Sequence, residues 1–259
     1  MTTRRLNRIF AEDGRAVIVA LDHGLIDGPC EGFESPGDTI EAVVAGGADA
    51  ILTSYGIARA FAKPLSRVGL IVRSDGAATN LGTPSTGSLS QFFGPVDAVR
   101  LGADALVVTA MPGSDKEEDT LENLARTVAE AHEWGLPVLG EMVPGGFNSG
   151  PEARGTDAIA LAARLGAELG ADFIKAPYCD DYDQVTSKTF APVVILGGAK
   201  GDETLMLQNI RSAIDAGARG VAIGRNVFQC DNPTAMTAAI VAVVHEDASV
   251  EQALAILNS

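Results

Sequence analysis

The sequence predicts an α/β protein that folds as a single (β/α)8 TIM barrel, and three observations favour this fold. Short apolar runs alternate with helical runs along the 259 residues. These apolar runs lack the strict alternation of a half-exposed strand, as is typical of parallel strands covered on both faces. The first run ends in Leu21-Asp22-His23-Gly24, without the G-x-G-x-x-G turn that an open dinucleotide-binding sheet usually carries there.

Each apolar run predicts one strand. The expected strands are Ala16–Leu21, Asp49–Ser54, Gly69–Arg73, Asp104–Thr109, Pro137–Met142, Asp172–Lys175, Pro192–Leu196 and Gly220–Gly224. The clearest expected helices are Thr120–Trp134, Ala158–Leu169, Leu205–Ala216, Pro233–His245 and Val250–Leu257. A Gly-Ala pair that suits a helix end precedes the second, fourth, sixth and eighth strands. Strands and helices that alternate in this way over about 250 residues have the size and pattern of a barrel.

We expect one domain over residues 1–259, with residues 1–15 as an N-terminal extension, because no linker or break in composition interrupts the pattern. The longest irregular stretch is Asp75–Ser90, which is rich in Gly, Ser and Thr. It follows the third strand on the face where barrel active sites lie. A substrate loop and an ordinary surface loop are both open at this position.

Composition and charge exclude several classes of function. Acidic residues outnumber basic ones by 34 to 19, and the net charge of −15 argues against a nucleic-acid partner or an anionic membrane surface. No apolar run approaches the roughly 18 residues of a membrane span, and the N-terminus lacks a signal-peptide core. Three widely spaced cysteines and three histidines without ligand spacing predict no disulfide framework and no metal site. We therefore expect a reduced, cytoplasmic compartment.

Lys175 is the leading candidate for chemistry. It is one of five lysines and the one that closes an apolar run, within Gly170–Tyr178. A buried ammonium is costly unless it is paired or loses its proton. Two roles are therefore open for Lys175. It could be structural, as an ion-pair partner or a lysine that reaches to the strand end, or it could be a Schiff-base nucleophile. In the second case the amine attacks a substrate carbonyl, and the resulting iminium accepts electrons during carbon–carbon cleavage.

The carboxyl ends of all strands in a barrel face one pocket. Lys175 should therefore meet the polar residues that end the other strands. These residues are Asp22, His23, Ser54, Tyr55, Arg73, Asp75 and Glu141. Asp22 suits a general acid or base, or an ion-pair partner for a nearby ammonium. We expect His23 to be a hydrogen-bonded neighbour rather than a metal ligand.

Glycine turns follow the seventh and eighth strands. The first is Leu196-Gly197-Gly198-Ala199-Lys200 and the second is Ile223-Gly224-Arg225-Asn226. Barrels commonly bind phosphate with the loops after these two strands, where glycines let backbone N–H groups approach the oxygens. Arg225 adds a charged, forked donor. Glycines also permit tight turns without any ligand, but the occurrence of both turns on neighbouring strands favours a phosphate site.

Several motifs match a known family. They are Leu21–Gly24, Ala163–Asp172, Lys175 with Tyr178, Gly197–Lys200 and Gly224–Gln229. On these motifs the chain resembles the archaeal-type class I fructose-bisphosphate aldolase group of the deoxyribose-phosphate aldolase-like superfamily. This group includes 2-amino-3,7-dideoxy-D-threo-hept-6-ulosonate synthase. The resemblance covers nearly the whole chain and is most specific over residues 163–229.

The resemblance implies a barrel in which Lys175 forms the Schiff base, Asp22 is a catalytic carboxylate and no cofactor is needed. It also implies a small phosphorylated sugar or keto substrate and a homo-oligomer. It places phosphate contacts at Gly197, Gly198, Gly224 and Arg225. We expect the remaining substrate contacts at His23, Gly24 and Lys200.

One departure from the family concerns the end of the fifth strand. The family typically has Tyr-Pro-Arg-Gly there, with the tyrosine as proton donor and acceptor. Aligned on Pro144, this chain has Val143 in place of the tyrosine and Gly145 in place of the arginine. A valine cannot transfer protons. Glu141, two residues earlier on the same face of the strand, and Tyr55, after the second strand, are the candidates to replace the tyrosine.

We therefore expect a metal-independent lyase of carbohydrate metabolism, a class I aldolase that cleaves or forms a carbon–carbon bond in a phosphorylated ketose, as fructose-bisphosphate aldolase does. Two alternatives belong to the same group. One is a transaldolase-type heptulosonate synthase, and the other is an acetyl-transferring thiolase, which also lacks the tyrosine. An alternative of another class is a phosphosugar-binding barrel without turnover.

Overall fold

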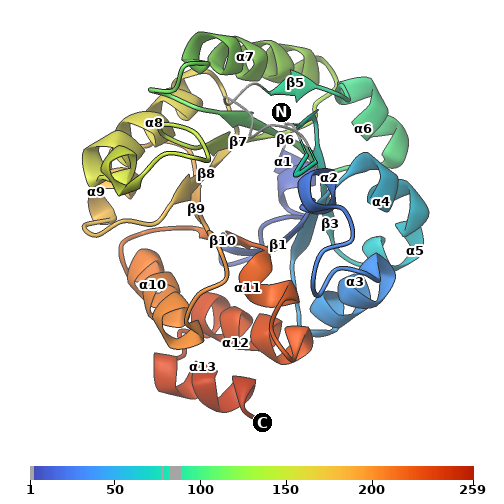
Figure 1. Ribbon diagram of the computed structural model, residues 1–259, viewed down its shortest axis with the longest axis vertical. Coiled ribbons are helices and arrows are strands. Elements are labelled where there is room, and N and C mark those ends of the chain that lie inside the picture. Colours follow the sequence, from blue (N-terminus) through green and yellow to red (C-terminus); the bar gives the residue numbers. More distant parts are fainter. Residues whose placement is uncertain (1–2, 77–78, 82–88) are drawn as a thin grey trace.

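Eight parallel strands close into a barrel in the computed structural model, which describes residues 3–76, 79–81 and 89–259 (Figure 1). The barrel strands are β1 (Ala16–Leu21), β2 (Ala50–Thr53), β3 (Gly69–Arg73), β6 (Ala105–Ala110), β7 (Val138–Met142), β8 (Phe173–Pro177), β9 (Val193–Leu196) and β10 (Gly220–Ile223). They follow one another around the barrel in chain order, and β10 pairs with β1 to close it. All the expected strands are confirmed, with small differences at their ends. The short strands β4 (Asp75–Gly76) and β5 (Ser90–Gln91) form a separate antiparallel pair.

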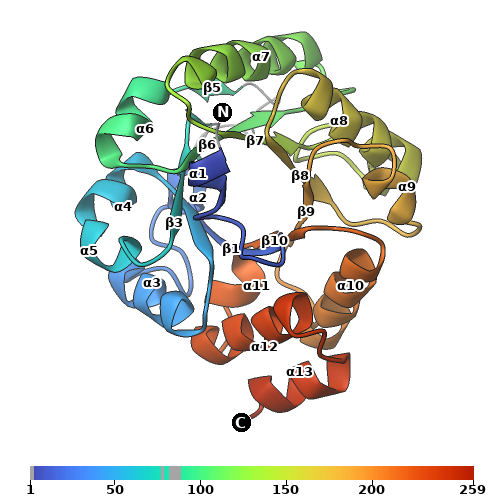
Figure 2. The same cartoon turned by 180° about the vertical axis from the view of Figure 1, so that it is seen from behind.

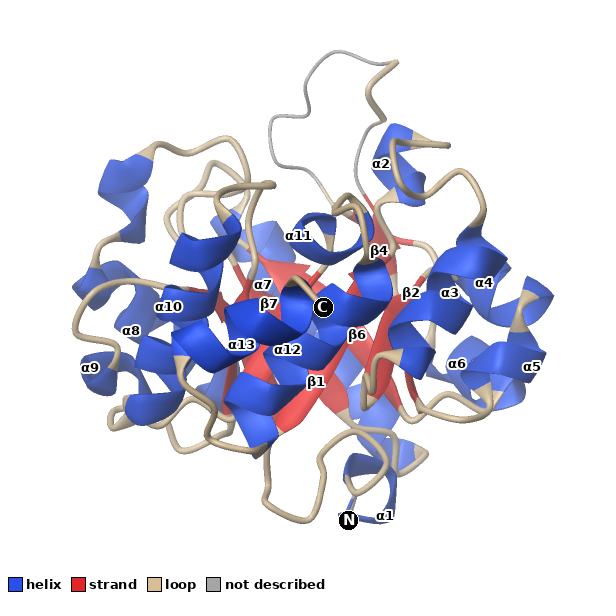
Figure 3. Ribbon diagram, turned by 90° about the horizontal axis from the view of Figure 1, so that it is seen from below, coloured by secondary structure: helices blue, strands red, loops and turns tan. Residues whose placement is uncertain are grey.

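Helices surround the barrel on all sides (Figures 1 and 2). They are α1 (Thr3–Leu6), α2 (Gly24–Asp27), α3 (Pro36–Ala45), α4 (Tyr55–Ala60), α5 (Ala62–Leu65), α6 (Pro95–Leu101), α7 (Glu117–Glu133), the 3₁₀ turn η1 (Pro151–Arg154), α8 (Thr156–Glu168), α9 (Asp183–Thr186), α10 (Glu203–Asp215), α11 (Arg225–Phe228), α12 (Pro233–His245) and α13 (Val250–Leu257). The expected helices are confirmed, and α12 and α13 have the expected bounds. In the side view, α2 and α11 lie at one end of the barrel and α1 lies at the other (Figure 3).

The long helix α7 shows how local sequence produces these elements. Its first turn carries Glu117, Glu118 and Asp119, whose charges favour the positive end of the helix dipole. Leu124, Val128 and other buried residues recur at helical spacing and form the face that packs on β6. The apolar face therefore fixes how the helix lies on the barrel, while the acidic turn favours where it begins.

Successive side chains of each strand alternate between two apolar layers. On β1, Val17, Val19 and Leu21 face the layer between strands and helices, whereas Ile18 and Ala20 face the barrel interior. The interior layer also contains Ile9, which is fully buried although it precedes β1. The segment before β1 therefore packs against the lower end of the barrel, opposite α2 and α11 (Figure 3).

Closure of the barrel depends on Gly220, the first residue of β10. Its φ is +127°, a conformation that side chains rarely adopt. A Cβ atom at this position would collide with the backbone oxygen of Ala16, its partner on β1. Glycine therefore allows the first and last strands to pair closely.

The expected substrate loop, Asp75–Ser90, falls partly outside the described residues, which omit 77–78 and 82–88. Of its described part, Asp75, Gly76, Asn80 and Leu89 line the central cavity. Within the part of the chain that the structure describes, no helix is both long and apolar enough to cross a membrane.

Candidate active site

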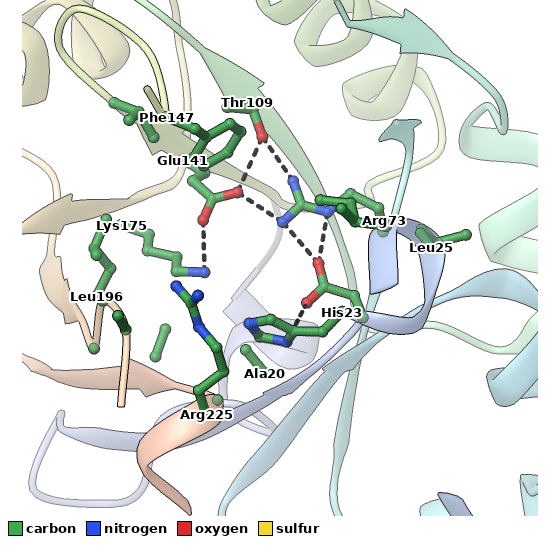
Figure 4. Close-up of a pocket in the computed structure, with 18 of the residues that line it drawn as sticks. Ala20, His23, Leu25, Arg73, Thr109, Glu141, Phe147, Lys175, Leu196 and Arg225 are labelled. Carbon is green, nitrogen blue, oxygen red and sulfur yellow. Dashed lines mark hydrogen bonds and ion pairs between the residues drawn. The ribbon is translucent and has the colours of Figure 1, made fainter. Parts of the chain in front are cut away.

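A cavity of about 560 Å³ opens at the carboxyl ends of the barrel strands (Figure 4). Its charged and polar lining comes from elements spread around the barrel. These side chains are Asp22, His23, Asp27, Arg73, Asp75, Asn80, Thr109, Glu141, Asn148, Arg154, Lys175 and Arg225. The cavity thus brings together residues that lie far apart in the sequence, as the barrel topology predicts.

Lys175 and Glu141 form a buried ion pair at the centre of this cavity. They are direct partners in the register of β7 and β8, so both side chains point to the same side of the sheet. The Lys175 Nζ atom lies 2.6 Å from Oε1 of Glu141. Only 6% of Lys175 and 4% of Glu141 is exposed to solvent. The lysine is therefore buried and paired, next to a carboxylate that can exchange a proton with it.

Arg73, at the end of β3, connects this pair to the opposite side of the cavity (Figure 4). Its Nη2 atom lies 2.6 Å from Oε2 of Glu141, and its Nε atom donates to Oδ2 of Asp22 at 2.8 Å. Its Nη1 atom contacts Asp75 at 3.1 Å and donates to the Thr109 hydroxyl at 2.8 Å. The Thr109 hydroxyl in turn donates to Glu141 at 3.0 Å. Arg73 is therefore fixed on several sides and holds both catalytic candidates, Asp22 and Glu141.

Burial and charge act in opposite directions on these carboxyl groups. Burial alone would raise the pKa of Glu141, but the charges of Arg73 and Lys175 hold that pKa well below its usual range. Asp22 follows the same pattern, and the charge of Arg73 outweighs burial and lowers its pKa. For Asp75 burial prevails, and its pKa is raised although Arg73 opposes the change. Glu141 and Asp22 are therefore ionised in the resting site.

His23 is held between Asp22 and the aromatic ring of Phe228. Its Nδ1 atom lies 3.6 Å from Asp22, and its ring centroid lies 5.1 Å from that of Phe228. Burial lowers the pKa of His23, although Asp22 opposes the change, which favours the neutral ring at neutral pH. Gly224 lies against it, because a Cβ there would collide with the His23 ring and lie 2.6 Å from the Ala20 oxygen.

The two expected phosphate turns lie side by side in the cavity wall. Gly197, Gly198, Gly224 and Arg225 all line it. Asn226 joins the two turns, because its Nδ2 atom donates to the backbone oxygens of Gly197 at 2.9 Å and Ala199 at 3.1 Å. Among the described residues, Arg225 has no ion-pair partner, and its buried Nε atom has no hydrogen-bond partner. This wall therefore offers backbone N–H groups and an uncompensated guanidinium to an anion.

Three expected site residues lie outside the cavity lining. Tyr55 begins α4, and its ring stacks on Phe93 with centroids 4.4 Å apart. Lys200 instead donates to the backbone oxygen of Gln229 at 2.5 Å. Gly24 begins α2 and faces Phe33. Glu141, and not Tyr55, is therefore the candidate that the structure brings to Lys175.

The lining contains no tyrosine among the residues that the structure describes, and Val143 occupies the wall. The sequence places Arg73 and Asp75 at the end of their strand but predicts no specific role for either. The signal for Arg73 is the one that identified Lys175, since Arg73 also closes a buried apolar strand. No comparable signal marks Thr109 or Arg154. No group of three or more His, Cys, Asp or Glu side chains within the described ranges is arranged to hold a metal ion.

Comparison with known proteins places this site in context. Residues 16–230 match the model of the DeoC/LacD family of aldolases. The chain is 43% identical to a 2-amino-3,7-dideoxy-D-threo-hept-6-ulosonate synthase of Halobacterium salinarum over 98% of this chain and 95% of that protein. It is 34% identical to 2-amino-3,7-dideoxy-D-threo-hept-6-ulosonate synthase 1 of Archaeoglobus fulgidus, over 97% of this chain and 94% of that protein.

Solved structures of archaeal fructose-1,6-bisphosphate aldolase have the same fold. One is 30% identical with a TM-score of 0.85, over 95% of this chain and 100% of that chain. Another, also 30% identical, has a TM-score of 0.84 over 94% of this chain and 99% of that chain. In that second structure the catalytic lysine is covalently bound to the carbinolamine intermediate of the substrate. The expected barrel and the expected family are both confirmed, and the chain belongs to the DeoC/LacD family of aldolases.

Proposed function

We propose that Lys175 is the Schiff-base residue of this aldolase and that Glu141 exchanges protons with it. The observation that carries the proposal is the buried contact of 2.6 Å between Nζ of Lys175 and Oε1 of Glu141. Lys175 must lose a proton before it attacks a ketone. Transfer of that proton to Glu141 neutralises both members of the buried pair, so no isolated charge is left behind.

The proposed chemistry proceeds in steps that Glu141 can serve. The neutral Lys175 amine adds to the substrate ketone and forms a carbinolamine. The protonated Glu141 then gives its proton to the carbinolamine hydroxyl, which leaves as water, and the iminium forms. A base removes the proton of the hydroxyl two carbons from the iminium carbon, the carbon–carbon bond breaks into the iminium, and an enamine and an aldehyde result. We assign the proton transfers to Glu141, with Asp22 as the second carboxylate.

The anion-binding wall completes the proposed site. Gly197, Gly198 and Gly224 present backbone N–H groups to a phosphate, and Arg225 adds charge. This wall lies next to Lys175, because β9 pairs with β8 and β10 pairs with β9. We therefore propose a phosphorylated ketose or another keto compound as substrate, with its ketone at Lys175. Where the substrate carries a phosphate next to the ketone, that phosphate would lie on this wall.

Two reactions fit this site, and we favour that of 2-amino-3,7-dideoxy-D-threo-hept-6-ulosonate synthase over the cleavage of fructose 1,6-bisphosphate. One observation supports this choice: the chain is 43% identical to a synthase and 30% identical to each of the two solved archaeal aldolases described above. Both compounds share a feature of structure. Each has a ketone near one end of its carbon chain and an anionic group, a carboxylate or a phosphate, at the other end.

Purified protein incubated separately with the heptulosonate and with fructose 1,6-bisphosphate tests this choice. The proposal predicts aldehyde release from the heptulosonate and little or no triose phosphate from the bisphosphate. Rapid release of triose phosphate would instead support the fructose-bisphosphate aldolase reaction. Lys175→Ala should abolish both, and cleavage that survives this change would contradict the Schiff-base mechanism itself.

We also propose a cytoplasmic homo-oligomer that acts in carbohydrate metabolism. Large apolar side chains on the outer surface support an assembly, since Leu161 on α8 is 60% exposed and Phe190 after α9 is 66% exposed. Light scattering coupled to size-exclusion chromatography gives the mass in solution. A mass equal to that of one chain would contradict the oligomer.

A further inference from the structure

The arginines that line the cavity fall into two groups. Arg73 is surrounded by carboxylates, and its charge is fully compensated. Arg154 and Arg225 have no ion-pair partner within the described part of the chain, and the Nε atom of each is buried without a hydrogen-bond partner. A partly buried guanidinium without a counter-charge is costly unless an anion completes the site. Arg225 belongs to the proposed anion-binding wall with the glycine turns, whereas Arg154 has no assigned role.

Arg154 lies at the end of η1, in the loop between β7 and α8. Its Nη2 atom donates to the backbone oxygen of Phe147 at 3.4 Å, and both residues line the cavity. In the close-up, Phe147 and Arg225 lie at opposite sides, and the amine of Lys175 lies between them (Figure 4). The two uncompensated arginines therefore belong to opposite walls, with the nucleophile in between.

The loop that carries Arg154 is fixed by its own hydrogen bonds. Gly145 and Gly146, with φ of +73° and +87°, turn the chain directly after β7. The Ser149 hydroxyl lies within hydrogen-bond distance of the backbone oxygens of Pro144 at 3.1 Å and Gly146 at 2.8 Å. These turns and hydrogen bonds fix the backbone of the loop that carries Arg154. Glu152 on the same turn is exposed and makes no ion pair with Arg154 among the described residues.

We infer that Arg154 binds an anionic group of the substrate at the end of its carbon chain remote from the ketone. This inference rests on the proposed function, which places the ketone at Lys175 and one phosphate near Arg225. A chain that runs from Arg225 past Lys175 reaches the wall of Phe147 and Arg154. Arg154 therefore selects substrates whose aldehyde fragment carries a phosphate or a carboxylate, the chemistry shared by both candidate substrates.

The test compares ligands that differ only in the remote anion. The ligand concentration that gives half-maximal borohydride trapping at Lys175 is measured for fructose 1,6-bisphosphate and fructose 1-phosphate. A second arm compares the heptulosonate with its C1 methyl ester, which lacks the carboxylate charge. The proteins are the wild type, Arg154→Met, Arg154→Lys and the control Arg164→Met. Arg164 lies on the outer surface of α8, paired with Glu168 at 2.7 Å.

In the wild type, half-maximal trapping is expected at concentrations about 10- to 100-fold lower for the ligand that carries the remote anion, in at least one arm, as a charge-assisted hydrogen bond predicts. Preference in the first arm identifies a phosphate, and preference in the second identifies a carboxylate. Arg154→Met should remove the preference without lowering maximal trapping, Arg154→Lys should keep part of it, and Arg164→Met should leave it intact.

Equal half-maximal concentrations in both arms of the wild type would overturn the inference. So would an Arg154→Met protein that keeps the wild-type preference. Failure of the proposed function gives a different result, because then no ligand is trapped at Lys175 in any protein. Fructose 1-phosphate lacks the remote anion, so it should be trapped equally in wild type and Arg154→Met. Its trapping shows that the Schiff base forms, and so separates failure of the Arg154 inference from failure of the proposed function.

Discussion

Glu141 and Lys175 lie opposite each other on neighbouring strands, and their charged atoms are 2.6 Å apart in the wall of the cavity. The family's usual tyrosine position is occupied by Val143. The carboxylate therefore reaches the nucleophile from a position two residues earlier on the same strand. This relationship, held in place by Arg73, leads to the first two predictions.

Glu141→Gln should lower turnover by about 10²- to 10⁴-fold, the range that a positioned general acid or base contributes. The amide has nearly the same shape but cannot accept the proton of Lys175. Initial rates with the heptulosonate or fructose 1,6-bisphosphate, together with circular dichroism to confirm the fold, measure the effect. Glu152→Gln, at an exposed site in the same region of the chain, is the matched control. A Glu141→Gln enzyme with the wild-type rate would show that another group transfers the proton.

Arg73 should set the acid side of the pH–activity profile. Burial by itself would raise the pKa of Glu141, and Arg73 is the first of the charges that lower it. Loss of that charge in Arg73→Met therefore raises the pKa of Glu141, and the carboxylate takes up a proton at a higher pH. The decline of kcat on the acid side should move to higher pH in this variant. Arg73→Lys, which keeps the charge without the fork, should show a smaller displacement.

The profiles are measured from pH 4 to 8 on protein whose circular dichroism matches that of the wild type. Identical acid limbs in the wild type and Arg73→Met would contradict the role of Arg73. If Arg73→Met does not fold, Arg73→Lys alone still decides, because its acid limb must then lie at a higher pH than that of the wild type.

Gly224→Ala should weaken the anion-binding wall. A Cβ at this position would meet the His23 ring and would lie 2.6 Å from the backbone oxygen of Ala20. Overpacking of this kind costs about 1–3 kcal/mol of stability unless the turn moves. A displaced turn no longer aims its backbone N–H groups at the phosphate, so the apparent KM for a phosphorylated ketose should rise. Gly201→Ala is the control, since nothing lies within 4 Å of the added Cβ. An equal KM for Gly224→Ala and Gly201→Ala would contradict the close fit at this turn.

His245 should make stability depend on pH at the opposite end of the barrel. Its ring contacts Asp49 at 2.9 Å and Asp13 at 2.8 Å. Hydrogen bonds to these carboxylates raise the pKa of His245 to about 9, although burial opposes them. An unfolded histidine has a pKa near 6.5, so the folded state gains stability from the proton below about pH 6.5 and loses it as the pH rises through about 9.

His245→Gln should therefore lower Tm by about 3–6 °C at pH 6, and the deficit should shrink towards pH 9. Differential scanning calorimetry at a fixed scan rate measures both proteins across this range. His132→Gln is the control, since His132 lies on the outer face of α7 and pairs with Asp172 rather than with Asp49. A deficit that stays constant between pH 6 and 9 would rule out the protonated ring as its source.

The barrel was predictable because each strand is a short run of residues buried on both faces, as β1 shows with every residue buried. Lys175 was predictable for the same reason, since a lone charge at the end of such a run must be paired or reactive. These signals are local in the chain. The apolar runs also show where each strand ends, and a barrel brings all the strand ends to one pocket.

The network around Arg73 was not predictable, because its partners are distant in sequence. Asp22 and Glu141 lie 51 and 68 positions away. The prediction that Tyr55 lies in the site was wrong for a related reason. The side chain of Ser54 accepts from the backbone N–H of Ile57 at 3.4 Å and caps α4, so the helix begins at once and the ring stacks on Phe93 instead. Only the packing of α4 against its neighbours decides the direction of that ring.

The most direct test of the central claim is reductive trapping of the Schiff base. The protein is incubated with a phosphorylated ketose and sodium borohydride, digested with trypsin and analysed by mass spectrometry. We predict that the added mass lies on Lys175 alone, so that trypsin no longer cleaves there and residues 165–188 remain one peptide. Lys175→Met should show no adduct. An adduct on Lys200 or another lysine, or none at all with a substrate that the enzyme turns over, would contradict the account.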